Sequence, residues 1–334
     1  MAFTAKLENY PGSDKDVIIL RSEHYRAEIA PFDGSNLIQM WDVVSQVPFF
    51  RDTEGVTAEA LRESAEVYGL PTLLFPNRLR DGVMHCSDAS YQFPITDIPE
   101  RCSMHGFLQR REHAILECAA DGKRAVARTS YLYDESDPFF PIFPVKLQAD
   151  YRFTLNEEGL EYAFTVTNLS ERQLPYGVCM HAAFRGDAES TRLFASVDER
   201  CKLDDRHLPI GKNRPLKGDE LLLLTGEKDP IYAGMDSEAY TAKAQPYGGE
   251  VLRGAVIRNI QTGHEIVYRV DDNFRFWVLW NDGGNQGFFC PEPSTWQIDA
   301  PNLNGTLEQT GYLELKPGES KTVHQWLSVI HKKL

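Results

Sequence analysis

The sequence predicts an all-β protein, a large antiparallel β-sandwich with very little helix. Many short segments alternate apolar or β-branched residues with polar ones, which is the pattern of strands that bury one face. Turn-forming residues separate these segments, and helical patterns are rare. Short strands joined by turns are typical of sandwiches and barrels.

The strand pattern recurs along the whole chain. The predicted strands are residues 17–21, 25–30, 36–41, 91–93, 125–133, 145–154, 160–167, 255–259, 264–270, 274–280 and 322–330. Residues 156–159, Asn-Glu-Glu-Gly, lie between two of them and predict a hairpin. Residues 57–66 are rich in Ala, Leu, Glu and Arg and predict the best helix, and a single helical turn is expected at residues 219–224.

The chain has 334 residues, with no repeat of fixed period and no Pro- or Ser-rich linker, so we predict a single domain over residues 1–334. The first residues lack the apolar segment of a signal peptide, and no apolar run approaches the roughly 18 residues of a membrane span. The six cysteines are scattered without a CxxC pair. We therefore expect a cytoplasmic protein with reduced thiols. We expect this protein to be either a monomer or a homodimer.

The charge of the chain excludes several classes of partner. Asp and Glu total 49 against 35 Lys and Arg, a net charge of −14, which repels phosphate backbones and anionic lipids. We expect neither nucleic-acid nor membrane binding. The sequence contains no HxH, HExxH or cysteine cluster and no glycine-rich nucleotide loop, so we expect no metal site and no cofactor.

Four stretches place ionisable residues in apolar or turn-forming surroundings: residues 75–82, 103–107, 175–184 and 287–294. In the first, the guanidinium fork of Arg78 suits a sugar diol or a carboxylate, and an ion pair within the protein fits equally well.

The other three stretches each present one candidate for proton chemistry. His105 precedes Gly106, which permits close approach of a ligand to the backbone. His181 lies in a nearly apolar run, where it needs a hydrogen-bond partner. Glu292 closes an apolar run between two prolines, which predicts a carboxylate at a strand end facing a cavity, as a general base requires. Structural histidines and a turn carboxylate are the alternatives.

Taken in order, these stretches resemble the aldose 1-epimerase (galactose mutarotase-like) family. The match comprises YGLPTLLFPNRLRDG (residues 68–82), MHGF (104–107), FPIFP (140–144), PYGVCMHAAF (175–184), CPEPST (290–295) and PNLN (301–304), and thus spans nearly the whole chain. The resemblance implies a β-sandwich of the galactose mutarotase type. It also implies a cofactor-independent isomerase that interconverts the α and β anomers of a free hexose.

The resemblance assigns roles to single residues. Glu292, ionised, resembles the general base, and His181, protonated, resembles the general acid of ring opening and closing. The residues that resemble the family's sugar-binding groups are Asn77, Arg78, His105 and Asp236. Trp280, Phe107 and Trp296 are candidates for stacking on the sugar.

The chain departs from the family pattern at two places, so the identity of the sugar stays open. Phe107 stands where the family has a second glycine, and Ala182-Ala183-Phe184 replaces Pro-Tyr-Phe. One alternative is a hexose-6-phosphate 1-epimerase, for which Arg80, Arg101, Arg110 and Arg111 are the candidate phosphate ligands. Others are a non-catalytic carbohydrate-binding protein of the same fold and an accessory domain of a glycoside hydrolase.

Overall fold

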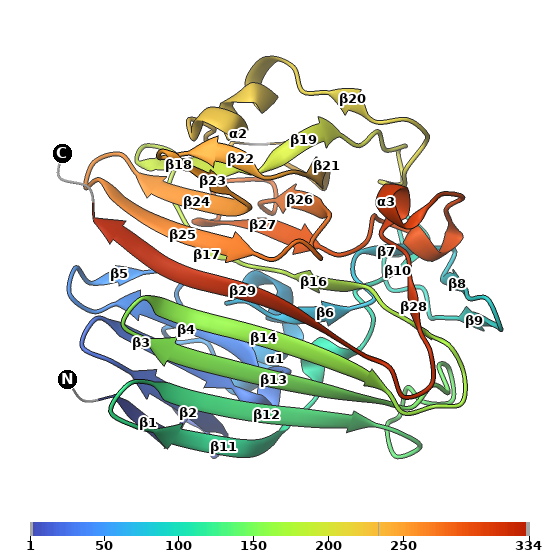
Figure 1. The fold of residues 1–334 in the computed structure, drawn as a ribbon, viewed down its shortest axis with the longest axis horizontal. Helices are drawn as coiled ribbons and strands as arrows, with labels where there is room; N and C mark the ends of the chain where they lie inside the picture. The colour runs from blue at the N-terminus through green and yellow to red at the C-terminus, as the bar shows by residue number, and fades with distance from the viewer. Residues whose placement is uncertain (1–2, 233, 332–334) are drawn as a thin grey trace.

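A computed structural model describes residues 3–232 and 234–331, whose regular structure is almost entirely antiparallel sheet (Figure 1). The front sheet consists of β11 (Ala114–Ala120), β12 (Ala125–Tyr133), β13 (Leu147–Asn156), β14 (Gly159–Asn168), β29 (Ser320–His331), β25 (His264–Val270), β24 (Gly254–Asn259) and β18 (Thr191–Ala195), in that order.

Two further sheets lie mostly behind the front sheet in Figure 1, and one end of the second sheet extends above it. The second sheet consists of β20 (Arg214–Pro215), β19 (Val197–Arg200), β21 (Glu238–Ala242), β26 (Phe276–Trp280), β27 (Phe288–Ser294), β16 (Val178–Met180) and β6 (Thr72–Leu74), and β17 (Phe184–Arg185) also pairs with β27. The N-terminal sheet consists of β1 (Thr4–Asn9), β2 (Asp16–Arg21), β3 (Tyr25–Ala30), β4 (Asn36–Asp42) and β5 (Val47–Pro48).

Short hairpins and helices connect the sheets. The two-stranded pairs are β7 (Arg78–Arg80) with β10 (Cys102–Met104), β8 (Val83–His85) with β9 (Ser90–Gln92), β15 (Leu174–Pro175) with β28 (Glu314–Leu315), and β22 (Gln245–Tyr247) with β23 (Glu250–Leu252). The helices are α1 (Ala58–Glu63), α2 (Leu222–Thr225) and α3 (Leu307–Thr310), with 3-10 turns η1 (Pro31–Asp33), η2 (Ala65–Val67), η3 (Leu108–Arg110), η4 (Gly218–Leu221) and η5 (Ala300–Asn302). Within the described residues, none of these helices is long and apolar enough to cross a bilayer.

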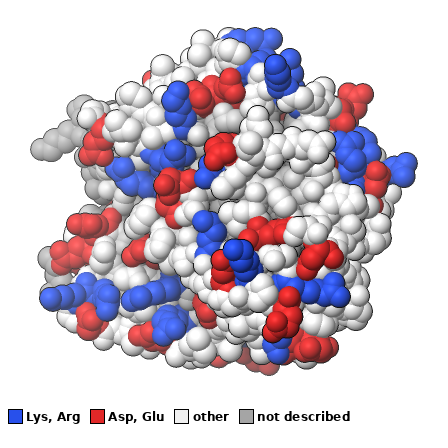
Figure 2. Space-filling view, turned by 45° about the vertical axis from the view of Figure 1, so that its right-hand side comes forward, with Lys and Arg blue, Asp and Glu red and all other residues white. Residues whose placement is uncertain are grey.

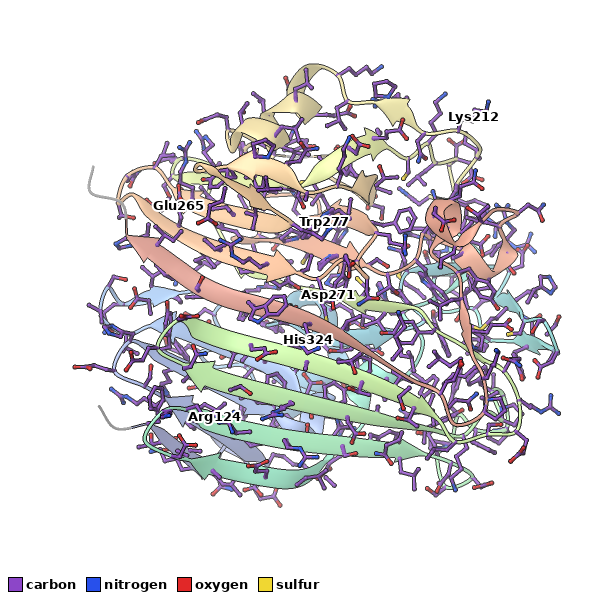
Figure 3. The ribbon with its side chains drawn as sticks, in the orientation of Figure 1. Arg124, Lys212, Glu265, Asp271, Trp277 and His324 are labelled. Atoms are coloured by element: carbon purple, nitrogen blue, oxygen red, sulfur yellow. The ribbon has the colours of Figure 1, made fainter. Side chains whose placement is uncertain are left out.

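One hydrophobic core joins the three sheets. It contains Leu20 of β2, Phe153 of β13 and Trp277 of β26, all buried. Trp277 lies behind the front sheet in Figure 3. The predicted β-sandwich is confirmed, because apolar residues from the inner faces of facing sheets fill the space between them.

The strand predictions are confirmed where alternation is strong. Each predicted strand overlaps an observed one, and the hairpin of β13 and β14 pairs from Asn156↔Gly159 onward. The predicted helix is shorter than expected, because α1 ends at Glu63 and a 3-10 turn follows it. β27 lies outside the predicted strand ranges, because the sequence indicated only a strand end at Glu292.

Charges of both signs mix on the surface. On the face drawn in Figure 2, Lys and Arg are interspersed with Asp and Glu. The excess of negative charge is therefore not gathered into one area of that face.

Candidate active site

Glu292 and His181 lie opposite each other on adjoining parts of the second sheet. The register Cys179↔Ser294 between β16 and β27, continued by two residues, sets His181 against Glu292. The Nε2 atom of His181 is 3.3 Å from Oε1 of Glu292, and both side chains are buried. The fold thus brings the two candidate proton-transfer groups into direct contact.

The position of Glu292 corrects the prediction of a strand end. Glu292 lies inside β27, where it pairs with Val278 of β26. The flanking residues Pro291 and Pro293 have no N–H to donate to a neighbouring strand. Accordingly, β27 pairs with β26 over five residues but with β16 at one position only. The Glu292 and His181 side chains meet just beyond that position, where β16 and β27 are no longer paired.

A tight turn and a short hairpin hold Asn77 and His105 together. Both residues have positive φ, 60° and 65°, and they flank the pair Arg78↔Met104 of β7 and β10. The His105 N–H donates to the Asn77 carbonyl at 3.0 Å, and the Asn77 N–H donates to His105 Nδ1 at 3.2 Å. Because Nδ1 accepts a hydrogen bond, the proton of the neutral ring lies on Nε2, which makes that nitrogen a donor.

Gly106 serves the protein backbone rather than a ligand. Its φ is 66°, and a Cβ at this position would lie 2.0 Å from the carbonyl oxygen of Leu74 in β6. The glycine after His105 is therefore required by close packing against β6, which corrects the expectation that it admits a ligand.

Arg78 is both buried and paired within the protein. Its Nε donates to Asp97 at 2.8 Å, and another guanidinium nitrogen donates to Ser237 at 3.1 Å. The ion pair that the sequence analysis offered as an alternative is thus present. No local pattern in the sequence points to Asp97, because only the tertiary fold places it beside Arg78.

Asp236 lies at the margin of this group. Its carboxylate accepts from the Ser237 hydroxyl at 3.3 Å and is 3.6 Å from His207 Nε2, and its side chain is 55% exposed. The neighbouring Ser237, rather than Asp236, lines the cavity described next. The structure therefore does not bring Asp236 together with the other predicted residues.

A cavity of about 640 Å³ opens onto these side chains. Asn77, Arg78, His105, His181 and Glu292 all line it. Its further lining residues include Glu66, Asp97, Arg110, Trp280 and Asp282, of which only Arg110 and Trp280 are predicted from the sequence.

Of the three residues predicted to stack on the sugar, Trp280 lines the cavity. Its ring centroid is 5.8 Å from that of His181, at an interplanar angle of 68°. Phe107 is instead buried against Phe139 and Tyr133, and Trp296 is buried against Phe75. Of the three stacking candidates, the structure therefore leaves Trp280 in place and assigns the other two to the core.

Burial controls the protonation of the central pair. Desolvation raises the pKa of Glu292 well above its ordinary range, and the nearby Arg78 charge lowers it by a smaller amount. Desolvation lowers the pKa of His181 to about 4, against a weaker opposing effect of Glu66. Both shifts favour the uncharged forms of Glu292 and His181 in the unliganded pair. They oppose the charge states that the family resemblance implies, an ionised Glu292 and a protonated His181.

His105 is also neutral. Desolvation lowers its pKa well below the ordinary range, and the neighbouring His181, Arg78 and Arg110 act in the same direction. The site thus presents a neutral imidazole donor beside the carboxyl group and imidazole ring of Glu292 and His181, which are in contact. Such a set can take a proton from one oxygen and give a proton to another without a net change in its own charge.

The comparisons with known proteins agree with this fold. A galactose mutarotase-like protein from Clostridium acetobutylicum has 26% sequence identity and a TM-score of 0.94, with 99% of each chain covered. A galactose 1-epimerase from Lactobacillus acidophilus has 15% identity and a TM-score of 0.74, covering 99% of this chain and 100% of its own. An aldose epimerase homologue from C. elegans has 16% identity and a TM-score of 0.71, covering 96% and 100%.

The sequence model that describes aldose 1-epimerase matches residues 17–328, which include every candidate residue of the cavity. The chain belongs to the aldose 1-epimerase family.

Proposed function

We propose that the protein is a mutarotase that interconverts the α and β anomers of a free hexose, with Glu292 as general base and His181 as general acid. The observation that carries the proposal is the 3.3 Å contact between His181 Nε2 and Glu292 Oε1 at the wall of the cavity. The two reacting oxygens of an aldose, O1 and O5, are bonded to the same carbon. An acid and a base that serve them must therefore lie within a few ångströms of each other.

Ring opening begins with a proton transfer inside the pair. The proton of Glu292 moves to His181 when the hydroxyl groups of the sugar hydrogen-bond to the carboxylate, because such bonds stabilise its charged form. Glu292 then accepts the proton of the C1 hydroxyl, and His181 donates its Nε2 proton to O5. The C1–O5 bond breaks, and C1 becomes an aldehyde.

Ring closure reverses these steps on the other face of the aldehyde. After rotation about the C1–C2 bond, His181 removes the proton from the C5 hydroxyl, O5 attacks C1, and Glu292 returns its proton to the carbonyl oxygen. Atoms and charges balance over the cycle. His105 Nε2 and the Arg78 guanidinium orient the sugar and stabilise negative charge on oxygen as it develops. Asn77 positions His105 through their mutual hydrogen bonds.

The charges of the cavity favour an unphosphorylated sugar. Arg78 is paired with Asp97, and Arg110 is paired with Glu66 at 2.8 Å. The other arginines considered for a phosphate are engaged elsewhere: Arg80 with Asp299, Arg101 with Asp81 and Arg111 with Asp137. A phosphate entering the cavity would have to displace a carboxylate, which costs electrostatic energy.

The same proposal treats residues 1–334 as one functional domain. A single core that contains both Phe3 and Leu327 supports it.

Polarimetry of freshly dissolved α-D-galactose, α-D-glucose and α-D-glucose 6-phosphate tests the proposal. We expect the protein to accelerate equilibration of a free hexose and to leave the phosphorylated one at its buffer rate. Acceleration of the phosphate ester alone would replace the proposal by a hexose-6-phosphate epimerase. Binding of the free sugars without acceleration would indicate a carbohydrate-binding protein.

A further inference from the structure

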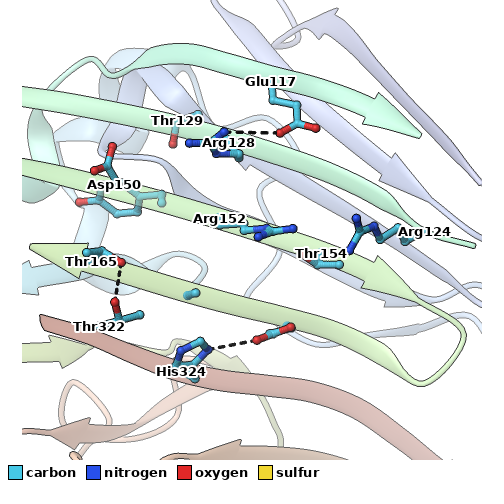
Figure 4. A pocket seen from close by; sticks show the side chains of 13 residues that line it. Glu117, Arg124, Arg128, Thr129, Asp150, Arg152, Thr154, Thr165, Thr322 and His324 are labelled. Carbon is cyan, nitrogen blue, oxygen red and sulfur yellow. Dashed lines mark hydrogen bonds and ion pairs between the residues drawn. The ribbon is translucent and has the colours of Figure 1, made fainter. Parts of the chain in front are cut away.

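A second cavity, of about 840 Å³, lies on the outer face of the front sheet, over β11 to β14 and β29 (Figure 4). We call it the outer groove. None of its lining residues belongs to the candidate active site. It therefore calls for a separate explanation.

One row of paired residues crosses the outer groove. Glu117, Arg128, Arg152, Ala163 and His324 are successive cross-strand partners from β11 to β29. Neighbouring strands are about 4.8 Å apart, so the row spans roughly 19 Å. The small Ala163 leaves room between Arg152 and His324. A ligand that follows the row is therefore longer than one sugar ring.

Among the described residues, two carboxylates of the outer groove accept hydrogen bonds, whereas one of its arginines has no side-chain partner. Asp150 accepts from Ser130 at 2.6 Å, and Glu161 accepts from His324 at 3.0 Å. Arg152, by contrast, makes no ion pair or side-chain hydrogen bond with any described residue. Its guanidinium group is available to an anion.

The cross-strand neighbour of Arg152 is a second arginine. Arg152 lies directly opposite Arg128, whose nearest carboxylate, that of Glu117, is 3.9 Å away. Like charges directly opposite each other on antiparallel strands destabilise the sheet. Arg124, 3.7 Å from Asp121, also lines the groove, and Figure 4 shows the Arg152 side chain extended in its direction. An anion bound along this line relieves the repulsion.

The far end of the row offers groups that suit sugar rings. Thr165 and Thr322 share a hydrogen bond of 2.8 Å between their hydroxyls. His324 stacks with Trp326 at 5.9 Å and 14°, and the Trp326 side chain is 38% exposed. Hydroxyls and an exposed aromatic face bind the polar edges and the C–H faces of sugars, respectively.

We propose that the outer groove binds a short acidic oligosaccharide, with its carboxylates on Arg152 and Arg128 and a sugar ring toward Trp326. Guanidinium groups bind carboxylates with two parallel hydrogen bonds. The groups are spread along the groove, which suits charges that repeat along a chain rather than one compact anion. The net charge of −14 disfavours long polyanions such as nucleic acids. This proposal is independent of the proposed mutarotase activity.

Calorimetric titration with trigalacturonate tests the proposal, with maltotriose as an uncharged trimer of the same α-1,4 linkage. We expect wild-type protein to bind trigalacturonate about tenfold more tightly than maltotriose, the ratio for one charge-assisted hydrogen bond. Arg152→Ala should remove this preference. Arg21→Ala, which changes an exposed arginine in β2, should retain it. Added salt should weaken the binding of trigalacturonate but not that of maltotriose.

Four results would overturn the proposal. Equal affinity for the two trimers would show that the carboxylates of trigalacturonate do not contribute to binding. Unchanged binding by Arg152→Ala would place the ligand elsewhere. Displacement of trigalacturonate by α-D-galactose would assign its binding to the active-site cavity. Equally effective displacement by inorganic phosphate would show a simple anion site. Because Arg152 is exposed, its replacement should not prevent folding.

Discussion

The substitution Glu292→Gln should abolish most of the epimerase activity while leaving the fold intact. Glutamine has nearly the same volume as glutamate, so it leaves no cavity in β27. It keeps a polar atom toward His181, which is 3.3 Å away in the wild type. It cannot, however, exchange the proton that the pair shares, and ring opening then lacks its base.

The expected loss follows from the role of the lost group. General acid–base catalysis contributes typically ~10²–10⁴-fold, so kcat should fall by at least ~10²-fold, about 2.7 kcal/mol in barrier height. KM should change much less, because Arg78, His105 and Trp280 still line the cavity. Polarimetry of α-D-galactose over a range of concentrations separates the two constants.

A stability measurement shows whether the loss of activity in Glu292→Gln results from unfolding of the variant. Burial raises the pKa of Glu292, so its carboxyl group binds a proton more tightly in the folded state than in the unfolded state. The wild type therefore loses stability as pH rises above the ordinary glutamate pKa. The glutamine side chain of the variant does not titrate, so the variant should unfold at a higher denaturant concentration than the wild type at pH 7.

Glu265→Gln is a matched control. Glu265 is also a buried glutamate, on β25 of the front sheet (Figure 3), where it accepts a hydrogen bond from Tyr247 at 2.9 Å. We expect this variant to keep wild-type kcat. If Glu292→Gln retained more than a tenth of the wild-type kcat, Glu292 would not be the base. If Glu292→Gln unfolded at a lower denaturant concentration than the wild type, the inferred rise of the Glu292 pKa on folding would be wrong.

Three further predictions concern the same site. The rate should fall on the acid side near pH 4, because burial lowers the pKa of His181 to about 4 and protonated His181 can no longer accept the proton of Glu292. A fall already near pH 6.5 would contradict the effect of burial on His181. Trp280→Ala should raise KM roughly 2- to 10-fold with a smaller effect on kcat, and an unchanged KM would show that the ring does not contact the sugar. Gly106→Ala should destabilise the fold by about 1–3 kcal/mol in denaturant unfolding, because the new Cβ meets the Leu74 carbonyl at a φ of 66°, and wild-type stability would refute the close packing.

The sequence by itself determined the strands with strong alternation and the identity of the candidate reactive groups. Alternation over residues 125–133 and 160–167 is a local property, and each of these segments became a strand of the front sheet. The four motif stretches also supplied five residues that line one cavity: Asn77, Arg78, His105, His181 and Glu292. Side-chain chemistry and short-range pattern are readable in the order of residues.

Only the tertiary structure decided the contacts and the protonation of these groups. The contact between His181 and Glu292 depends on strand register, and their protonation depends on burial by the whole fold. The partner of Arg78, the exposure of Asp236 and the choice of Trp280 as the aromatic wall likewise depend on segments distant in sequence. Desolvation and Coulomb energies arise from neighbours in space, and local patterns carry no information about them.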